Sequence, residues 1–425
     1  MQLQLQGFRK EPGSPVHEAL AALRNATVRA SDQHESARHE SDQHGPTGRL
    51  PWLVAYTPVA RMNPYQALTY RHFGDEQMAV SPVLDPESFE ALIPLMDQPS
   101  GKQGIVLHLH WLNTVLRGAT SQAQAEDLMA RYLQRLKRFK DAGGYIAWTV
   151  HNLAPHDAVY LNAERALQQS VADLADVVHV MSADTPQLVA DFLQLDPERT
   201  VVSPHPSYLG AYPDVVPRDQ ARSMLGLAED EVVYVVFGAI KAYKGIEGLL
   251  AGFDRLRATS TVPRRLIIAG GPDRDRRTRR LLKKLRMHPH VLLHDVKVPN
   301  DQVQYLLRAA DLMVLSHQVA LNSGAAMLGP TFDLPLVANR VGVLPGLLED
   351  SFTEFLPGAE PEAVAAGLER SDRLLTPDAR QAAGAFARRH HPELVSADLA
   401  RQMRARLEGS ARPRHDLTVA GPADQ

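Results

Sequence analysis

The 425-residue sequence contains no cysteine. This absence excludes a disulfide framework, thiolate catalysis and cysteine-ligated zinc. No apolar run approaches the roughly 18 residues that span a bilayer, and residues 1–12 lack the apolar core of a signal peptide. We therefore expect a cytoplasmic protein, while a peripheral contact with the inner membrane face stays open. The formal net charge is only −3, which argues against a dedicated nucleic-acid-binding protein.

Composition and punctuation divide the chain. Residues 1–48 have few aromatics and repeat Ser-Asp-Gln-His at 31–34 and 41–44, so we expect a poorly ordered leader with one short helix over 16–23. A stretch rich in proline and glycine at 206–217 is typical of an inter-domain linker. The expected divisions are 1–48 leader, 49–205 N-terminal domain, 206–217 linker, 218–376 C-terminal domain, 377–411 helices packing back toward the N-terminal domain, and 412–425 tail.

Short apolar runs alternate with amphipathic stretches in both long divisions. In the first, strands are expected over 53–56, 105–109, 145–150 and 177–181; in the second, over 232–237, 265–269, 291–294, 312–315 and 336–338. This alternation predicts α/β architecture with parallel sheets covered on both faces. Two such Rossmann-like, doubly wound domains face each other across a cleft, and ligands bind such sheets at the carboxyl ends of the strands.

The segment 235–246 combines a strand, a glycine-bounded loop and a helix start. Gly238 follows the strand, Lys241 and Lys244 lie in the loop, and Gly245 precedes a helix with apolar residues at spacings of three and four. A helix N-terminus with two lysines suits a diphosphate. From spacing alone, a solvated surface loop is an equal alternative.

This segment resembles the donor-phosphate loop of GT-B glycosyltransferases, above all those similar to glycosyltransferase family 4. Three further segments are similar to the family pattern: 266–272 with its glycine turn, 309–316, and 322–325 with 333–338. The resemblance implies that Lys241 and Lys244 hold the diphosphate of a nucleotide sugar. The donor-binding residues that it implies are Gly238, Lys241, Lys244, Gly271, Asn322, Ser323 and Gly324.

The sequence departs from the family at one place. The family usually carries two glutamates eight positions apart, where this chain has Ala320 and Leu328. Neither side chain can bind a hydroxyl by charge. A subset of similar enzymes uses a Ser-Gly loop instead, and the run Asn322, Ser323 and Gly324 fits that version.

Histidines follow two of the expected strands in the first domain. His108 and His110 are two residues apart and share one face of a strand. His151 follows the next expected strand, where it can face the cleft as a general base or bind a sugar hydroxyl. Each histidine can equally be a structural one. Carry-over from the resembling family selects His151 first and His110 second as catalytic candidates, and Asp157 is the nearest carboxylate base for an inverting reaction.

Two further features have open interpretations. His205, with Tyr208 and Tyr212 nearby, is expected to line the cleft. The basic run 274–286 is either a solvated helix face or a surface attracted to anionic lipid headgroups. We expect no metal site, because the His-x-His pair has no further ligands at a telling spacing.

The resulting expectation is a metal-independent hexosyltransferase. It moves a sugar from a nucleotide diphosphate donor, its only cofactor-like partner, to a hydroxyl acceptor that could be lipid-linked, and binds no nucleic acid. The donor base and the stereochemical outcome stay open. The alternatives are a nucleotide-sugar epimerase or hydrolase on the same fold and a non-catalytic nucleotide-sugar-binding protein.

Overall fold

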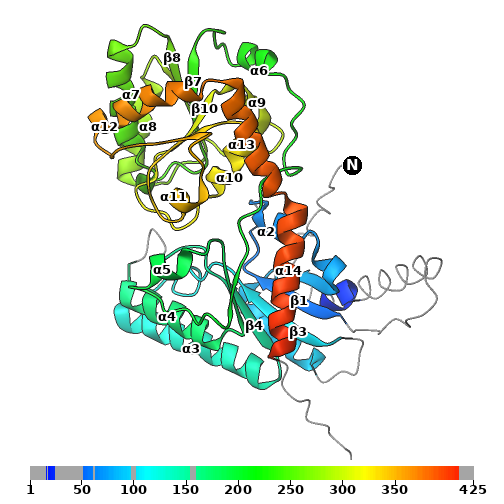
Figure 1. Cartoon of the computed structure of the whole chain (residues 1–425). Helices are drawn as coiled ribbons and strands as arrows, with labels where there is room; N and C mark the ends of the chain where they lie inside the picture. Colours follow the sequence, from blue (N-terminus) through cyan, green and yellow to red (C-terminus); the bar gives the residue numbers. More distant parts are fainter. Residues whose placement is uncertain are drawn as a thin grey trace, which may run out of the picture.

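A computed structural model of the chain describes residues 16, 18–23, 51–60, 63–96, 102–153 and 159–410. These residues form two domains, each built on a six-stranded sheet (Figure 1). No helix in these ranges combines the length and the apolar character needed to cross a membrane.

The N-terminal domain contains a parallel sheet with the strand order β2-β1-β3-β4-β5-β6. Its strands are β1 Trp52–Thr57, β2 Met78–Pro82, β3 Gly104–Leu109, β4 Tyr145–Thr149, β5 Val177–Val180 and β6 Thr200–Val202. Its helices are α2 Tyr65–Thr69, α3 Gln122–Asp141, α4 Leu161–Leu174 and α5 Thr185–Val189, with 3-10 helices η1 Phe73–Glu76 and η2 Pro86–Leu95.

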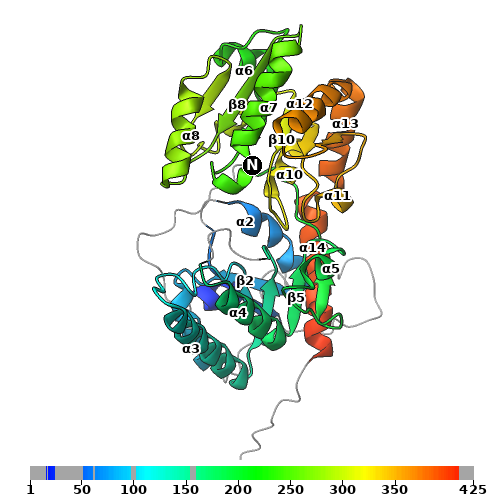
Figure 2. The ribbon, with the colours of Figure 1, turned by 90° about the vertical axis from the view of Figure 1, so that its left-hand side faces the viewer.

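Both faces of this sheet are buried. Alternate strand residues pack against α3 and α4 on one face, where Leu136 and Phe139 of α3 are fully buried. Helix α3 begins at Ser121, whose hydroxyl accepts a hydrogen bond of 3.2 Å from the backbone of Gln124. Figure 2 shows α3 and α4 together on this side.

A helical segment at 16 and 18–23 joins the same core, where Ala19 and Leu23 are buried. The short helix expected within the leader is therefore present, and its apolar face covers part of this core. The rest of 1–48 and the expected tail at 412–425 lie outside the described residues.

The C-terminal domain repeats the architecture with the parallel strand order β12-β11-β10-β7-β8-β9. Its strands are β7 Val232–Phe237, β8 Arg264–Ala269, β9 Val291–His294, β10 Leu312–Leu315, β11 Leu336–Ala338 and β12 Thr353–Phe355. Its helices are α6 Arg218–Met224, α7 Ile246–Thr259, α8 Arg276–Arg286, α9 Val303–Ala309, α10 Gly324–Thr331, α11 Leu344–Leu347, α12 Pro361–Arg370 and α13 Pro377–Arg389, with 3-10 helices η3 Ala242–Lys244 and η4 Ser371–Leu374.

A buried carboxylate fixes the start of the central strand β7. Asp311, just before β10, accepts hydrogen bonds from the Arg222 guanidinium (2.8 Å) and from the backbone of Val233 (2.9 Å). Arg380 of α13 bonds the same carboxylate at 3.2 Å. A buried carboxylate needs such partners, so Asp311 has a structural role that positions the loop at the other end of β7.

The last helices connect the two domains. Thr376 caps α13 by accepting a bond of 3.2 Å from the backbone of Ala379, as its place before a proline predicts. The region 377–411, where helices are expected, contains two of them, α13 and α14 (Pro392–Gly409); the break falls before Pro392, because a proline disfavours helical backbone in the residue before it.

Helix α14 lies on the N-terminal domain, against the sheet face opposite α3 and α4 (Figure 1). Its buried residues Leu399, Met403 and Leu407 pack with Trp52 and other residues of that face. At the junction with α13, the carbonyl of His390 accepts a bond of 2.7 Å from the backbone of Ser207. The two places where the chain passes between the domains therefore touch.

Candidate active site

The loop after β7 is folded around a buried lysine. The ammonium of Lys244 turns back and donates to the carbonyl of Phe237, at the end of the strand, over 3.0 Å. Gly238 has a φ of +100°, and a Cβ there would lie 2.9 Å from that ammonium nitrogen. Gly245 has a φ of +64°, and a Cβ there would lie 2.5 Å from the carbonyl oxygen of Ser316. Both glycines of the loop are thus required by geometry.

Burial changes the acidity of this lysine. The Lys244 side chain is only 7% exposed. Burial, together with the nearby charge of Lys241, lowers its pKa to about 8. Lys241 is more exposed and lies 3.8 Å from a carboxylate oxygen of Asp273. A bound anion beside Lys244 would stabilise the charged form of this lysine, which burial disfavours.

Lys244 borders the larger of two cavities between the domains, with a volume of about 590 Å³. Both expected donor loops reach it, through Gly238 and Lys244 on one side and Asn322, Ser323 and Gly324 on the other. Its other lining residues include Asn63, Pro64, Asn152, Tyr208, Tyr212, Phe237, Tyr243, Gly270, Gly271, Lys297, Val298, Asn300, His317, Ala320 and Leu328. The cavity is therefore shared by both domains and the linker.

The second expected donor loop also makes contact across the cleft. The side-chain amide of Asn322 donates to the carbonyls of Val150 (3.3 Å) and His151 (3.1 Å) in the N-terminal domain. Ser323 is the N-cap residue of α10. A Cβ at Gly324 would lie 2.6 Å from the Tyr208 hydroxyl, so a larger residue there would displace that hydroxyl.

The residues at the two usual glutamate positions are apolar and line this same cavity. Ala320 and Leu328 both border it, in agreement with the departure seen in the sequence. Tyr208 and Tyr212 also line it, as expected. His205 lies beside it, 3.5 Å from the position of a Cβ on Gly324.

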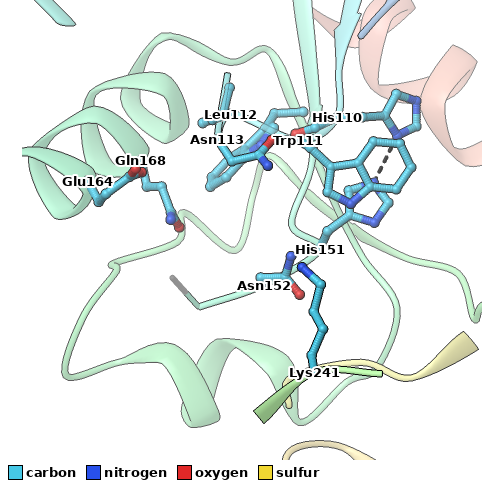
Figure 3. A pocket seen from close by; sticks show the side chains of 10 residues that line it. His110, Trp111, Leu112, Asn113, His151, Asn152, Glu164, Gln168 and Lys241 are labelled. Carbon is cyan, nitrogen blue, oxygen red and sulfur yellow. Dashed lines mark hydrogen bonds between the residues drawn. The ribbon is translucent and has the colours of Figure 1, made fainter. Parts of the chain in front are cut away.

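The smaller cavity, about 190 Å³, lies at the carboxyl ends of β3 and β4 (Figure 3). The residues that line it are His110, Trp111, Leu112, Asn113, Trp148, His151, Asn152, Glu164, Gln168 and Lys241. The structure thus separates the two expected phosphate-binding lysines, because Lys244 borders the larger cavity and Lys241 the smaller one. Asn152 lines both cavities and marks where they meet.

Two catalytic candidates meet in this smaller cavity. His151 and His110 lie with Nε2 of the first 2.9 Å from Nδ1 of the second, as the dashed line in Figure 3 shows. The indole of Trp111 stacks on His151, with ring centroids 4.1 Å apart. His108 shares a face with His110, as expected, and their rings stack at 4.5 Å. His108 is fully buried away from the cleft.

The histidines of this cluster are held neutral. Burial lowers the pKa of His110 and of His151 well below the ordinary value of histidine, and neighbouring imidazoles lower it further. A neutral imidazole has one bare nitrogen that can accept a proton. The third catalytic candidate, Asp157, lies outside the described residues.

Three cavity residues did not stand out in the sequence. Trp111 directly follows His110, so its position was the available signal. Glu164 and Gln168 are four residues apart on α4, the spacing that puts two side chains on one helix face. Within the described ranges, no group of three or more His, Asp or Glu side chains is arranged to hold a metal ion.

Known proteins agree with this geometry. The family model of glycosyl transferases group 1 matches residues 217–389. No curated protein sequence matches the chain. Sucrose-phosphate synthase from Thermosynechococcus elongatus is a structural neighbour with a TM-score of 0.62 and 15% identity, over 85% of this chain and 100% of that chain.

Two further neighbours contain sugar or nucleotide ligands. HepE of Anabaena, in complex with UDP, has a TM-score of 0.59 and 15% identity, over 84% of this chain and 100% of that chain. The UDP-forming α,α-trehalose-phosphate synthase from Burkholderia xenovorans, in complex with glucose-6-phosphate, has a TM-score of 0.57 and 14% identity, over 83% of this chain and 100% of that chain. The chain therefore has the GT-B fold that its sequence predicts, and its segment 217–389 matches the family model of glycosyl transferases group 1, in agreement with the expected glycosyltransferase class.

Proposed function

We propose that the chain transfers a sugar from a nucleoside diphosphate donor to a hydroxyl acceptor held in the cleft. One observation carries this proposal: a buried ammonium group, Lys244, at the end of β7, borders a cavity of about 590 Å³ that both domains line. A buried cation without a bound counter-charge is costly. A diphosphate would supply that charge and fill the cavity beside it.

The donor side can stabilise the leaving group without a divalent cation. Lys244 supplies a full positive charge, and the N-terminus of the 14-residue helix α7 adds a partial one. Negative charge grows on the diphosphate as the sugar departs, so preorganised positive groups act where they lower the barrier most. We expect EDTA to leave the transfer rate unchanged. A rate that requires added Mg²⁺ would show instead that a metal supplies this charge.

The acceptor side is the smaller cavity. His151 offers a neutral imidazole there, and Trp111 provides an aromatic wall of the kind that packs on sugar rings. Glu164 and Gln168 provide polar groups for hydroxyls. Since Asn152 lines both cavities, we place the reacting centre beside it. Closure of the domains around both substrates would orient them and exclude water, which would otherwise hydrolyse the donor.

A panel of nucleotide sugars tests this function. UDP sugars come first, because HepE is known in complex with UDP-glucose and the trehalose-phosphate synthase is UDP-forming. GDP, ADP and dTDP sugars complete the panel. We expect one nucleotide to raise the melting temperature and its sugar to be transferred to a hydroxyl acceptor. Free sugar or isomerised donor without transfer would favour a hydrolase or an epimerase, and binding without turnover a non-catalytic protein.

A membrane-bound acceptor is a finer part of the proposal. Helix α8 buries Leu281, Leu282 and Leu285 and exposes cations on its other side, among them Lys283 and Lys284. Such a face attracts anionic headgroups, so the protein would work at the inner membrane face on a lipid-linked acceptor. We expect co-sedimentation with anionic vesicles and a loss of it on Lys283→Glu with Lys284→Glu. Equal binding to neutral vesicles would contradict this part.

A further inference from the structure

The carboxyl edge of the N-terminal sheet carries a continuous line of hydrogen-bonded side chains. Three members lie within β3, β4 and β5, and the other three follow the ends of α2, β3 and β4. All six are buried or half-buried. We call this set the histidine relay: Tyr70, His108, His110, Thr149, His151 and His179. The proposed function uses only His151, so the other five need an explanation.

The inner half of the relay ends on a backbone carbonyl. Nε2 of His179 lies 2.9 Å from the carbonyl oxygen of Ser203. Nδ1 of the same ring lies 3.0 Å from the hydroxyl of Thr149, and that hydroxyl lies 2.8 Å from Nε2 of His108. Each step crosses to the neighbouring strand, because β3, β4 and β5 are adjacent in the sheet.

The outer half passes through a tyrosine. The hydroxyl of Tyr70 lies 2.7 Å from Nδ1 of His108 and 2.7 Å from Nε2 of His110. Nδ1 of His110 then lies 2.9 Å from Nε2 of His151. The edges of the Tyr65 ring contact both His110 and His151, with centroids 6.0 and 5.2 Å away, which keeps the two imidazoles in place.

The terminal carbonyl sets the direction of every bond. A carbonyl oxygen only accepts, so His179 must donate from Nε2 to Ser203. Its neutral ring then has a bare Nδ1, which accepts from Thr149. The hydroxyl oxygen of Thr149 accepts from Nε2 of His108, whose bare Nδ1 accepts from Tyr70. The hydroxyl hydrogen of Tyr70 is thereby used.

The same argument continues to the cleft. Because Tyr70 donates to His108, its oxygen accepts from Nε2 of His110. The bare Nδ1 of His110 then accepts from Nε2 of His151. That leaves Nδ1 of His151 bare. No hydrogen-bond partner of this nitrogen is found among the described residues, and Figure 3 places Asn152 and Lys241 on the side of the ring away from His110.

We propose that the histidine relay locks His151 in the tautomer with hydrogen on Nε2 and so presents a bare Nδ1 to the cleft as the proton acceptor for the incoming hydroxyl. Tyr70, His108, Thr149 and His179 are positioning residues, since they act through His151 and touch neither substrate. The use of this nitrogen in transfer rests on the proposed function, whereas the tautomer itself does not. In the reaction, the acceptor oxygen loses its proton to Nδ1 as it bonds to the sugar carbon, and the bond from that carbon to the diphosphate breaks.

Nuclear magnetic resonance reads the tautomer directly. In the full chain with ¹⁵N-labelled histidine, the protonated and bare ring nitrogens of a neutral imidazole have well-separated shifts. The signals of His151 are identified by their loss in the His151→Gln variant. At pH 7 we expect His151 to be neutral with hydrogen on Nε2. Hydrogen on Nδ1, or a doubly protonated ring, would overturn the proposal whatever the activity.

Two substitutions break the relay at different points. Tyr70→Phe removes the hydroxyl that joins His108 to His110, and Thr149→Val removes the one that joins His108 to His179. In Tyr70→Phe we expect the tautomers of His151 to become mixed and kcat to fall about 10- to 100-fold, by analogy with the partners that orient metal-binding histidines. In Thr149→Val, the tautomers of His108 lose their preference.

A matched control separates the effect of losing a relay hydrogen bond from the effect of altered side-chain packing. The ring of Tyr56 lies 4.6 Å from that of Tyr70 but is outside the relay, so Tyr56→Phe should leave both the tautomer and kcat unchanged. An unchanged single tautomer in the folded Tyr70→Phe and Thr149→Val proteins would also overturn the proposal. If no transfer is ever detected but the tautomers respond as expected, the relay stands and the proposed function fails.

Discussion

Replacing Lys244 by methionine is expected to lower kcat/KM for the nucleotide sugar by about 100- to 1,000-fold, the effect of losing one preorganised group that stabilises transition-state charge. Methionine is close to lysine in length and is apolar, so it fills the same buried space beside Gly238 and preserves the fold. Most of the loss should fall on kcat, since the leaving diphosphate gains charge in the transition state. Initial rates over a range of donor concentrations measure both parameters.

The control for this change is Lys137→Met on α3, an exposed lysine outside both cavities, which should leave the transfer kinetics unchanged. The lowered pKa of Lys244, about 8, predicts a pH dependence that can be measured. Its charged form exists below that pH, so kcat/KM should fall as the pH rises through about 8. A bound diphosphate favours the charged form, so kcat should fall only at higher pH. Persistence of the first decline in the Lys244→Met protein would assign it to another group.

Replacing His151 by glutamine is expected to lower kcat by about 100- to 1,000-fold, within the range for loss of a general base. The glutamine amide can still donate to Nδ1 of His110, as His151 does, but it has no nitrogen that takes up a proton. Because the proposed donor site is mainly the other cavity, the dissociation constant of the donor should change less than about twofold. Transfer rates and calorimetric titration with donor give the two quantities.

His72→Gln serves as the reference, because His72 lies outside both cavities and bonds Asp75 instead. A His151→Gln enzyme with normal kcat would remove the general base from the mechanism. It would favour departure of the diphosphate ahead of attack, with the acceptor proton leaving to another oxygen. Weaker donor binding with unchanged kcat would place His151 on the donor instead.

Long apolar strands and strongly amphipathic helices were predictable from the sequence. The strand expected over 232–237 has the same bounds as β7, and the helix expected from residue 246 is α7, which begins there. The short edge strands were missed. Strands β6 and β12 have three residues each, and β2 ends on a proline. A three-residue segment is too short for periodicity to register, and the proline weakens the strand signal of the five-residue β2. The equally short β11 was expected because it lies in a segment similar to the family pattern.

The residues around the larger cavity were more predictable than those around the smaller one. Gly238, Lys244 and Gly324 occur in local motifs, and the structure places them around one cavity. Lys241, three residues before Lys244, borders the other cavity, because the tight turn between them points the two side chains apart. Spacing in a loop does not reveal that direction.

The relay could not be found in the same way. Tyr70 lies 38 and 40 residues from the two histidines that its hydroxyl joins, and no local pattern links them. Only the order of the strands brings His108, Thr149 and His179 into line. The sequence around a buried histidine does not show whether its ring is hydrogen-bonded to other side chains. These hydrogen bonds depend on which strands are neighbours in the folded sheet.

The chain passes between the two domains twice, and a hydrogen bond between Ser207 and His390 joins the two passages. This bond limits how the domains can move apart. Two chain segments fastened to each other at one point act as a pivot, since neither can lengthen independently. Opening is then a swing in which displacement grows with distance from that pivot. A swing that opens the cleft would have to break the bonds from Asn322 to the carbonyls of Val150 and His151.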